Sequence, residues 1–280
     1  MEPWLADLKE RAARLFDRDW IAHVRGLNAA YHLTGRDAFV ESRWPPLWFQ
    51  GDIESIEPGR WVAVLSLNPK TASDRWLDWL EQQEFTPESY WNYLRHIDLR
   101  GLDYFRDEYF YVKFDRPLVR LIALAVGEPL PVIADEVGYK RRRMRSFETI
   151  PYASHEYRLG SDTLRSLLDK DEGCRLAADF TRAVIANGRP AAVLLNGLPA
   201  VETFTEAWRE AAELRVVEYP SDTRPNRLMK HWEGVLSTPR GPIPVVGFRQ
   251  LRTISGHNSD GEVAQLGRYI ARATGAPIAD

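Results

Sequence analysis

The chain has 280 residues, of which 44% are hydrophobic and 28% are charged, and its formal net charge is −3. This composition is that of an ordinary globular protein, which excludes a chain that is disordered over most of its length. The single cysteine, Cys174, excludes an intramolecular disulfide and any metal site or iron–sulfur cluster built from several cysteines.

The first predicted elements are two packed helices. Apolar residues between positions 4 and 33 recur at helical spacing. We expect residues 1–50 to form a helical extension that packs on the main domain. Residues 44–60 contain three prolines and two glycines, and they are predicted as a connecting loop.

Apolar strands and helices alternate along the rest of the chain. Residues 61–67 form a run typical of a strand that is buried on both faces, and Asn68-Pro69 ends it. Further strands are predicted over residues 146–150, 191–195, 215–219 and 243–248. Helices are predicted over residues 71–84, 117–126, 162–168, 173–187, 199–214 and 262–274, and a loop over residues 127–138.

This alternation is typical of a mainly parallel sheet that helices cover on both faces. We expect a three-layer α/β/α fold with a central four-stranded sheet and extra N-terminal helices, which forms a single domain over residues 1–280. Ligands of such sheets bind at the carboxyl ends of the strands. Four polar turns leave those ends: residues 68–70, residues 151–154, Asn196-Gly197 and the loop around His257.

Several common motifs are absent from the sequence. We find no phosphate-binding or dinucleotide-binding glycine loop, no nucleophile elbow and no zinc-deaminase signature. We therefore expect neither a cofactor nor a metal. The N-terminal residues lack the order of a signal peptide, and no apolar run approaches the length of about 18 residues that a membrane span needs. We expect a cytoplasmic protein without a membrane partner.

The segment Leu65-Ser66-Leu67-Asn68-Pro69-Lys70 resembles the first motif of the uracil-DNA glycosylase superfamily. In its mismatch-specific and single-strand-selective branches this motif is Gly-[Ile/Met]-Asn-Pro-Gly and follows the first core strand. The strand before Asn196-Gly197 resembles the superfamily's central strand. The loop with His257 resembles its second motif, His-Pro-Ser or Asn-Pro-Ser. This sequence has serine and lysine in place of the two glycines, and residues 255–259 contain no proline.

The resemblance implies a monofunctional DNA glycosylase, which flips a damaged or modified base out of the DNA and hydrolyses its N-glycosidic bond. Asn68 would orient the attacking water. His257 would donate a hydrogen bond to the base oxygen that gains negative charge. The departures from the family pattern favour a specialised branch, such as one that excises a modified base of invading phage DNA in antiviral defence.

The same resemblance implies further contacts with the substrate. The base would be contacted by Leu67, Pro69, Lys70, Tyr152, Ser154 and Asn196. The DNA would be contacted by Arg141, Arg142, Arg143, Arg249, Arg252, Asn258 and Ser259. The first three of these arginines belong to the sequence KRRRMR at residues 140–145, which is the strongest basic run of the chain.

Structural interpretations compete with these roles. Asn68 can cap the next helix, Lys70 and His257 can face solvent, Tyr152 can be a core aromatic, and the basic run can be a solvated loop. Two other functions remain open: a non-catalytic DNA-binding module of the same fold, and a hydrolase of free nucleosides or nucleotides. Nothing in the sequence requires more than a monomer, so we expect a monomer.

Overall fold

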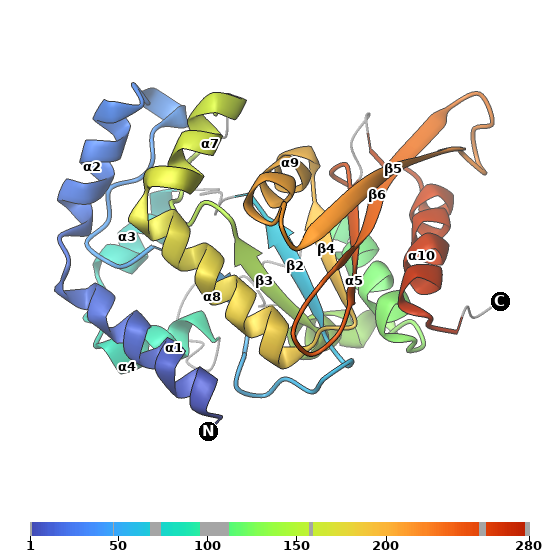
Figure 1. Ribbon diagram of the computed structural model, residues 1–280, viewed down its shortest axis with the longest axis horizontal. Helices are drawn as coiled ribbons and strands as arrows, with labels where there is room; N and C mark the ends of the chain where they lie inside the picture. The colour runs from blue at the N-terminus through green and yellow to red at the C-terminus, as the bar shows by residue number, and fades with distance from the viewer. Residues whose placement is uncertain are drawn as a thin grey trace. The chain divides into compact units, whose positions relative to one another are not determined.

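The computed structural model describes residues 2–46, 48–67, 74–95, 112–156, 159–251 and 256–277. It shows an α/β protein, as the sequence predicts, in which helices and strands alternate (Figure 1). The chain forms two compact units, each from three segments. The first unit comprises Met1–Glu54, Leu67–Asp103 and Phe147–Val184. The second comprises Ser55–Ser66, Tyr104–Ser146 and Ile185–Asp280.

The strands form a sheet of seven in the order β1-β3-β2-β4-β7-β6-β5. Their bounds are β1 Phe49–Gln50, β2 Val62–Ser66, β3 Met144–Glu148, β4 Ala192–Asn196, β5 Ala212–Pro220, β6 Leu228–Leu236 and β7 Ile243–Phe248. Strands β2, β4 and β7 are parallel neighbours, whereas β7, β6 and β5 are antiparallel. The prediction of a four-stranded, mainly parallel sheet is therefore wrong, because the sheet is larger and mixed.

The additional strands have physical reasons. The predicted helix over residues 199–214 ends early, since α9 covers Leu198–Ala207 and β5 begins at Ala212. Residues 212–214 favour a helix locally, but pairing with β6 overrides that preference. Strand β6 mixes polar and apolar residues because much of the β5–β6 hairpin is exposed or half-buried, so it lacks the unbroken apolar run of a buried strand.

The helices of the first unit include the predicted N-terminal pair. Their bounds are α1 Pro3–Arg14, α2 Trp20–Ala30, α3 Asp74–Glu81, α4 Pro87–Leu94, α7 Ser161–Lys170 and α8 Glu172–Gly188, the last of which ends in the second unit. Helix α2 begins at Trp20 because the side chain of Asp19 accepts a hydrogen bond from the amide of Ala22. Trp20, Tyr152 and Cys174 belong to the core of this unit.

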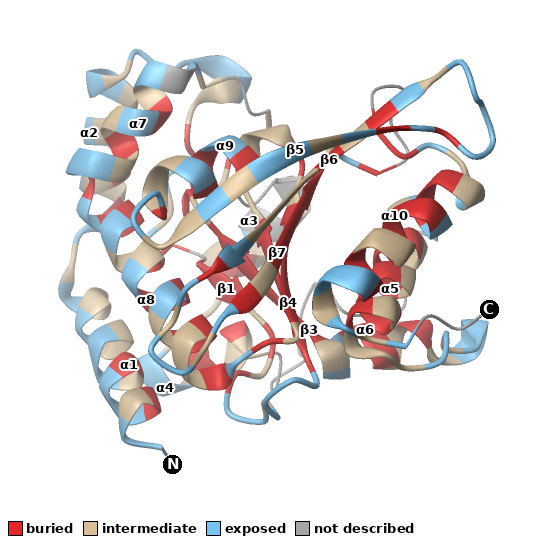
Figure 2. Ribbon diagram, turned by 45° about the vertical axis from the view of Figure 1, so that its right-hand side comes forward, coloured by how far each residue is buried: buried red, intermediate tan, exposed pale blue. Residues whose placement is uncertain are grey.

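The second unit carries α5 Val112–Val126, α6 Glu136–Arg143, α9 and α10 Asp260–Thr274. Helices α5 and α10 pack together on one face of β2, β4 and β7, where they bury Val64, Leu194 and Phe248 (Figure 2). Helix α9 covers the opposite face, and a Cβ atom at Gly247 would clash with Val201 of that helix. In the described part of the chain, no helix is long and apolar enough to cross a membrane.

Candidate functional site

The predicted site residues divide between the two units. Leu67, Tyr152 and Ser154 belong to the first unit. The second unit holds Arg141, Arg142, Arg143, Asn196, Arg249, His257, Asn258 and Ser259. Asn68, Pro69, Lys70 and Arg252 lie outside the described residues.

The carboxyl ends of β4 and β7 meet at one edge of the second unit's sheet. Asn196, the last residue of β4, pairs with Phe248, the last residue of β7, and His231 of β6 pairs with Phe248 from the other side. Residues opposite one another in neighbouring strands point to the same face. Asn196 and His231 therefore share the face of Phe248, which is the face that α5 and α10 cover.

This edge contains buried polar atoms that have no hydrogen-bond partner among the described residues. They are Oδ1 of Asn196, Nδ1 of His231, Nε of Arg249 and Nδ1 of His257. A buried polar group without a partner costs about 1–3 kcal/mol, so such groups are rare in folded proteins. Their concentration at the strand ends marks this edge as the candidate functional site of the second unit.

His257 is the most distinctive residue of this site. Its side chain is fully buried, and its Nε2 lies 2.7 Å from the hydroxyl oxygen of Tyr219. Burial, together with the nearby His231, lowers the pKa of His257 to about 4, so the imidazole is neutral at pH 7. Burial also raises the pKa of Tyr219, which keeps its proton. A tyrosine hydroxyl that donates to Nε2 leaves the imidazole proton on Nδ1, as a free donor.

Glu262 of α10 holds the loop that carries His257. The fully buried carboxylate accepts hydrogen bonds from the amides of Asn258 and Ser259 and from the side chains of Ser221 and Arg224. Burial alone would raise the pKa of Glu262, but these bonds lower it to about 2. The side chain of Ser259 in turn caps α10, because its hydroxyl oxygen accepts a hydrogen bond of 3.2 Å from the amide of Glu262.

Sequence reasoning missed Glu262 and Tyr219. The spacing Ser259-x-x-Glu262 before an apolar helix is the signature of a capping box, and it could have identified the glutamate. No local pattern connects Tyr219 with His257, because the contact joins β5 to a loop 38 residues later. It depends on the β5–β6 hairpin, most of which the sequence did not reveal.

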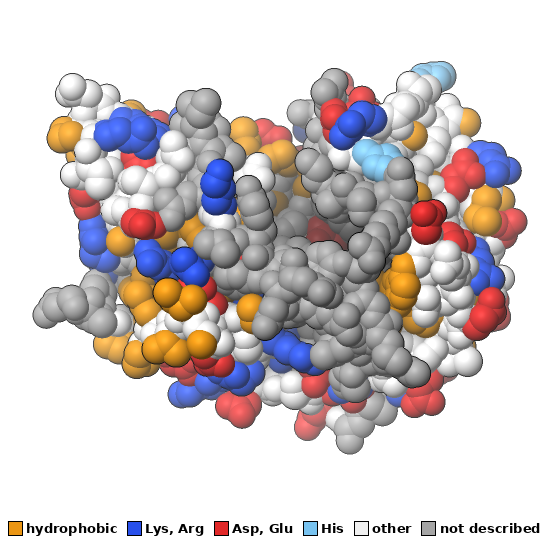
Figure 3. Space-filling model, turned by 180° about the vertical axis from the view of Figure 1, so that it is seen from behind, with side chains coloured by type: hydrophobic (Ala, Val, Ile, Leu, Met, Phe, Trp, Pro, Cys, Tyr) orange, Lys and Arg blue, Asp and Glu red, His pale blue; other side chains and the backbone are white. Residues whose placement is uncertain are grey.

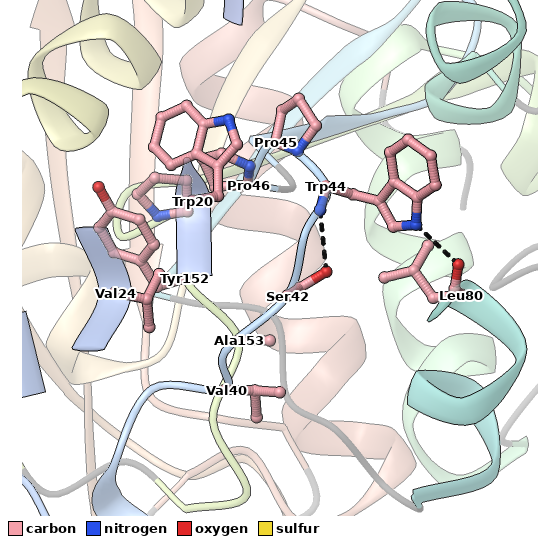
Figure 4. A pocket seen from close by; sticks show the side chains of 11 residues that line it. Trp20, Val24, Val40, Ser42, Trp44, Pro45, Pro46, Leu80, Tyr152 and Ala153 are labelled. Carbon is pink, nitrogen blue, oxygen red and sulfur yellow. Dashed lines mark hydrogen bonds between the residues drawn. The ribbon is translucent and has the colours of Figure 1, made fainter. Parts of the chain in front are cut away.

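In the first unit, Tyr152 and Ser154 have internal hydrogen-bond partners. The buried hydroxyl of Tyr152 donates to Asp171 at 2.6 Å and lies 2.9 Å from Nε2 of His23. The hydroxyl of Ser154 donates to the carbonyl oxygen of Glu156. Tyr152 also lines a cavity of about 30 Å³ with Trp20 and Trp44 (Figure 4), a space that suits about one or two water molecules.

The chain segments that follow β2 and β3 are joined by a hydrogen bond at Leu67. This residue follows β2, and its carbonyl oxygen accepts a hydrogen bond of 2.7 Å from the amide of Ile150, two residues beyond β3. The predicted turn at residues 151–154 follows directly after Ile150. Nearby Glu148, the last residue of β3, has a buried Oε2 without a hydrogen-bond partner among the described residues.

The basic run is part of regular structure rather than a solvated loop. Residues 136–143 form α6, which also corrects the predicted loop over residues 127–138, and β3 follows at once. Lys140 is buried and bonds to Asp115 at 2.7 Å, while Arg142 pairs with Asp135 and Arg143 with Glu128. Arg145 is buried as well, whereas Arg141 is exposed.

Charges of both signs lie among one another on the face seen in Figure 3. Figure 3 shows Lys and Arg side chains interspersed with Asp and Glu on that face, among the residues drawn in colour. Within the described residues, no group of three or more His, Cys, Asp or Glu side chains is arranged to hold a metal ion. Comparison with known protein families, curated proteins and solved structures found no match to this chain.

Proposed function

We propose that the protein is a monofunctional DNA glycosylase, which hydrolyses the N-glycosidic bond of a flipped, damaged or modified base and leaves an abasic site. The observation that carries this proposal is the neutral imidazole of His257, whose Nδ1 has no partner among the described residues. It stands on the loop after β7, where the second motif of the uracil-DNA glycosylase superfamily is expected from the resemblance. DNA is the proposed partner, and the cytoplasm is the proposed compartment.

A neutral imidazole suits the departure of a base. When the bond between C1′ and the base nitrogen breaks, negative charge develops on the base oxygens. An N–H group aimed at such an oxygen stabilises the transition state more than the ground state, and removing one typically lowers the rate about 100–1000-fold. In the proposed reaction Nδ1 of His257 is this donor, and the amide oxygen of Asn68 orients the attacking water.

The buried position of His257 adds a requirement. A base can contact Nδ1 only after the side chains around the imidazole separate, because His257 is fully buried. Ligand binding would then give partners to polar atoms that have none within the described part of the chain, such as Oδ1 of Asn196 and Nε of Arg249. Lys70 and Ser66, which replace family glycines, favour a modified base of invading DNA over uracil as the substrate.

The test is the formation of abasic sites, read as alkali-labile strand cleavage. The substrates are single and double strands that contain uracil, mismatched thymine, hydroxymethylcytosine or glucosylated hydroxymethylcytosine. We expect the wild type to cleave at least one substrate, and Asn68→Ala and His257→Ala to be slower by about 100-fold or more. His32→Asn, which changes an exposed histidine at a φ of 54° that asparagine tolerates, is the control and should keep full activity.

Two results would replace the proposal with the other functions. Salt-sensitive DNA binding without cleavage of any substrate would indicate a non-catalytic DNA-binding module. The absence of both binding and cleavage would point to a hydrolase of free nucleosides or nucleotides, which release of the free base from nucleosides would then detect.

A further inference from the structure

Strand β5 is the outermost strand at one end of the sheet and pairs with β6. It runs for nine residues, most of which are exposed or half-buried, and Figure 2 shows these exposed stretches along the border of the sheet. An edge of this length presents backbone N–H and C=O groups that another strand can bind. A groove of about 850 Å³ on one face of the sheet is lined by Glu213 and Arg215 together with residues of β6, β7 and α10, so solvent reaches these two side chains on that face.

The charges on this edge are incompletely paired. Glu213 and Arg215 are two residues apart and therefore lie on the same face of the strand. Arg215 contacts Glu233 of β6 at 2.6 Å, but its side chain is 79% exposed. The exposed carboxylate of Glu213 has no ion-pair partner in the described ranges, whereas Glu218 pairs with Lys230. One face of β5 thus offers an unpaired anion beside an accessible cation.

We propose that two copies of this chain associate through β5, which pairs with its own counterpart in antiparallel orientation about a two-fold axis at Leu214. In this register Glu213 of each copy lies opposite Arg215 of the other, so two ion pairs form. Leu214 lies opposite the other Leu214, and the two sheets join into one. This dimer takes the place of the monomer expected from the sequence, and it does not depend on the proposed function.

The charges select this register over its neighbours. A two-fold axis at Glu213 would set the two Glu213 carboxylates opposite each other, and an axis at Arg215 would do the same with the two guanidinium groups. Like charges in directly opposed positions destabilise an antiparallel pair, whereas opposite charges stabilise it. A closed two-fold pairing also covers both edges at once, so that assembly stops at two copies.

The experiment measures the mass of the full-length protein in solution by sedimentation over a range of concentrations. We expect the wild type to form a dimer. Arg215→Glu and Glu213→Arg should each weaken the dimer at least tenfold, because each places like charges opposite one another. The double variant with both changes restores the opposite charges and should dimerise like the wild type. Arg209→Glu, on an exposed residue before the strand, is the control and should have no effect.

Other outcomes overturn the proposal. A wild type that stays monomeric at every concentration would indicate that the charges of β5 prevent pairing between two such edges, or that β5 binds a strand of another protein. A dimer that persists in both single variants would form through another surface. A double variant that stays monomeric would exclude this register. Thermal unfolding of all variants verifies that they fold, and hydrogen exchange of the β5 amides should slow with protein concentration only in chains that dimerise.

Discussion

At the scale of single residues, three buried titratable side chains differ in the partners that the protein provides. Glu262 has several hydrogen-bond donors, and its pKa lies at about 2. His257 has one partner, Tyr219, and burial lowers its pKa to about 4. Glu148 has a carboxyl oxygen without a partner among the described residues, and burial raises its pKa to about 8. Glu262 is therefore built to be charged at neutral pH, while the other two are built to be neutral.

The first prediction concerns Glu148. Its pKa is raised on folding from 4.5 to about 8, so the folded state binds its proton more tightly than the unfolded state does. The protein should therefore lose stability as the pH rises between these two values, by a few kcal/mol in total, and the loss should level off above them. Glu148→Gln, which stays neutral, should lack this loss and be more stable than the wild type at pH 9.

Urea unfolding of both proteins at pH 6 and pH 9 measures this difference. Glu54→Gln is the control within the same unit, because Glu54 is a carboxylate paired with Arg95 and Trp91. Equal changes of the unfolding free energy with pH in the wild type and in Glu148→Gln would show that the Glu148 carboxyl is not kept neutral by burial.

At the scale of elements, α10 does more than cover the sheet. Its first turn provides Glu262, which binds the loop that carries His257. The same carboxylate also binds Arg224 and Ser221, which belong to the segment between β5 and β6. The helix start, the β5–β6 hairpin and the candidate site are thus connected through one carboxylate. Substitutions at the start of α10 should therefore alter the position of His257, although they do not change its side chain.

The second prediction tests this connection. Glu262→Gln should lower the unfolding free energy at pH 7 by about 2–3 kcal/mol, because the amides of Asn258 and Ser259 lose their buried charged acceptor. The folded-state pKa is depressed to about 2, so the contribution of the carboxylate is present above pH 4.5 and lost as the pH falls towards 2. The wild type and the variant should therefore approach equal stability near pH 2.

Denaturant unfolding as a function of pH provides the measurement. Glu218→Gln, which removes an exposed carboxylate paired with Lys230, should change stability by about 1 kcal/mol or less. A Glu262→Gln protein as stable as this control at pH 7 would contradict the connecting role of the carboxylate.

The elements also show where sequence reasoning succeeds. Strands β2, β4 and β7 are apolar runs buried on both faces, so their composition alone locates them within about one residue. Helices α7, α8 and α10 have clear apolar periodicity, and they too lie where they were predicted. Strand β6 and the start of β5 depend on pairing between distant segments, which no local pattern records.

In the candidate site, too, local patterns revealed some features, while others depend on contacts between distant segments. His257 and Asn196 could be selected because polar turns after buried strands mark the ligand-binding edge of a parallel sheet. Burial of His257 and its bond to Tyr219 could not be foreseen, since both depend on the hairpin. The ion pairs of the basic run could not be foreseen either, because charge alone does not reveal partners, and Asp115 lies 25 residues before Lys140 in the chain.

At the scale of the whole molecule, electrostatics is governed by pairing rather than by net charge. The net charge of −3 is small, and two arginines of α6, Arg142 and Arg143, are bound to carboxylates of their own unit. A DNA-binding surface on α6 would have to exchange these partners for phosphates. The protein should therefore bind DNA more weakly than five positive charges in six residues would indicate.

The third prediction uses this competition. Asp135→Asn removes the carboxylate 2.7 Å from Arg142 and so releases the guanidinium for a phosphate. We expect tighter DNA binding at low salt, with the slope of log K against log salt steeper by about 0.9. The control Asp179→Asn makes the same change of charge beside Arg182 on α8 and should leave the slope unchanged. Equal slopes in the two variants would place the DNA interface away from α6.

The place of β7 in the sheet bears on how the protein emerges from the ribosome. Among the described strands it comes last in the sequence, yet it lies between β4 and β6. Until residues 243–248 leave the exit tunnel, the nascent chain holds β4 and the β5–β6 hairpin without the strand that pairs with both, and the apolar edge of β4 stays open. A chain that ends before β7 should therefore expose apolar surface and be prone to aggregate.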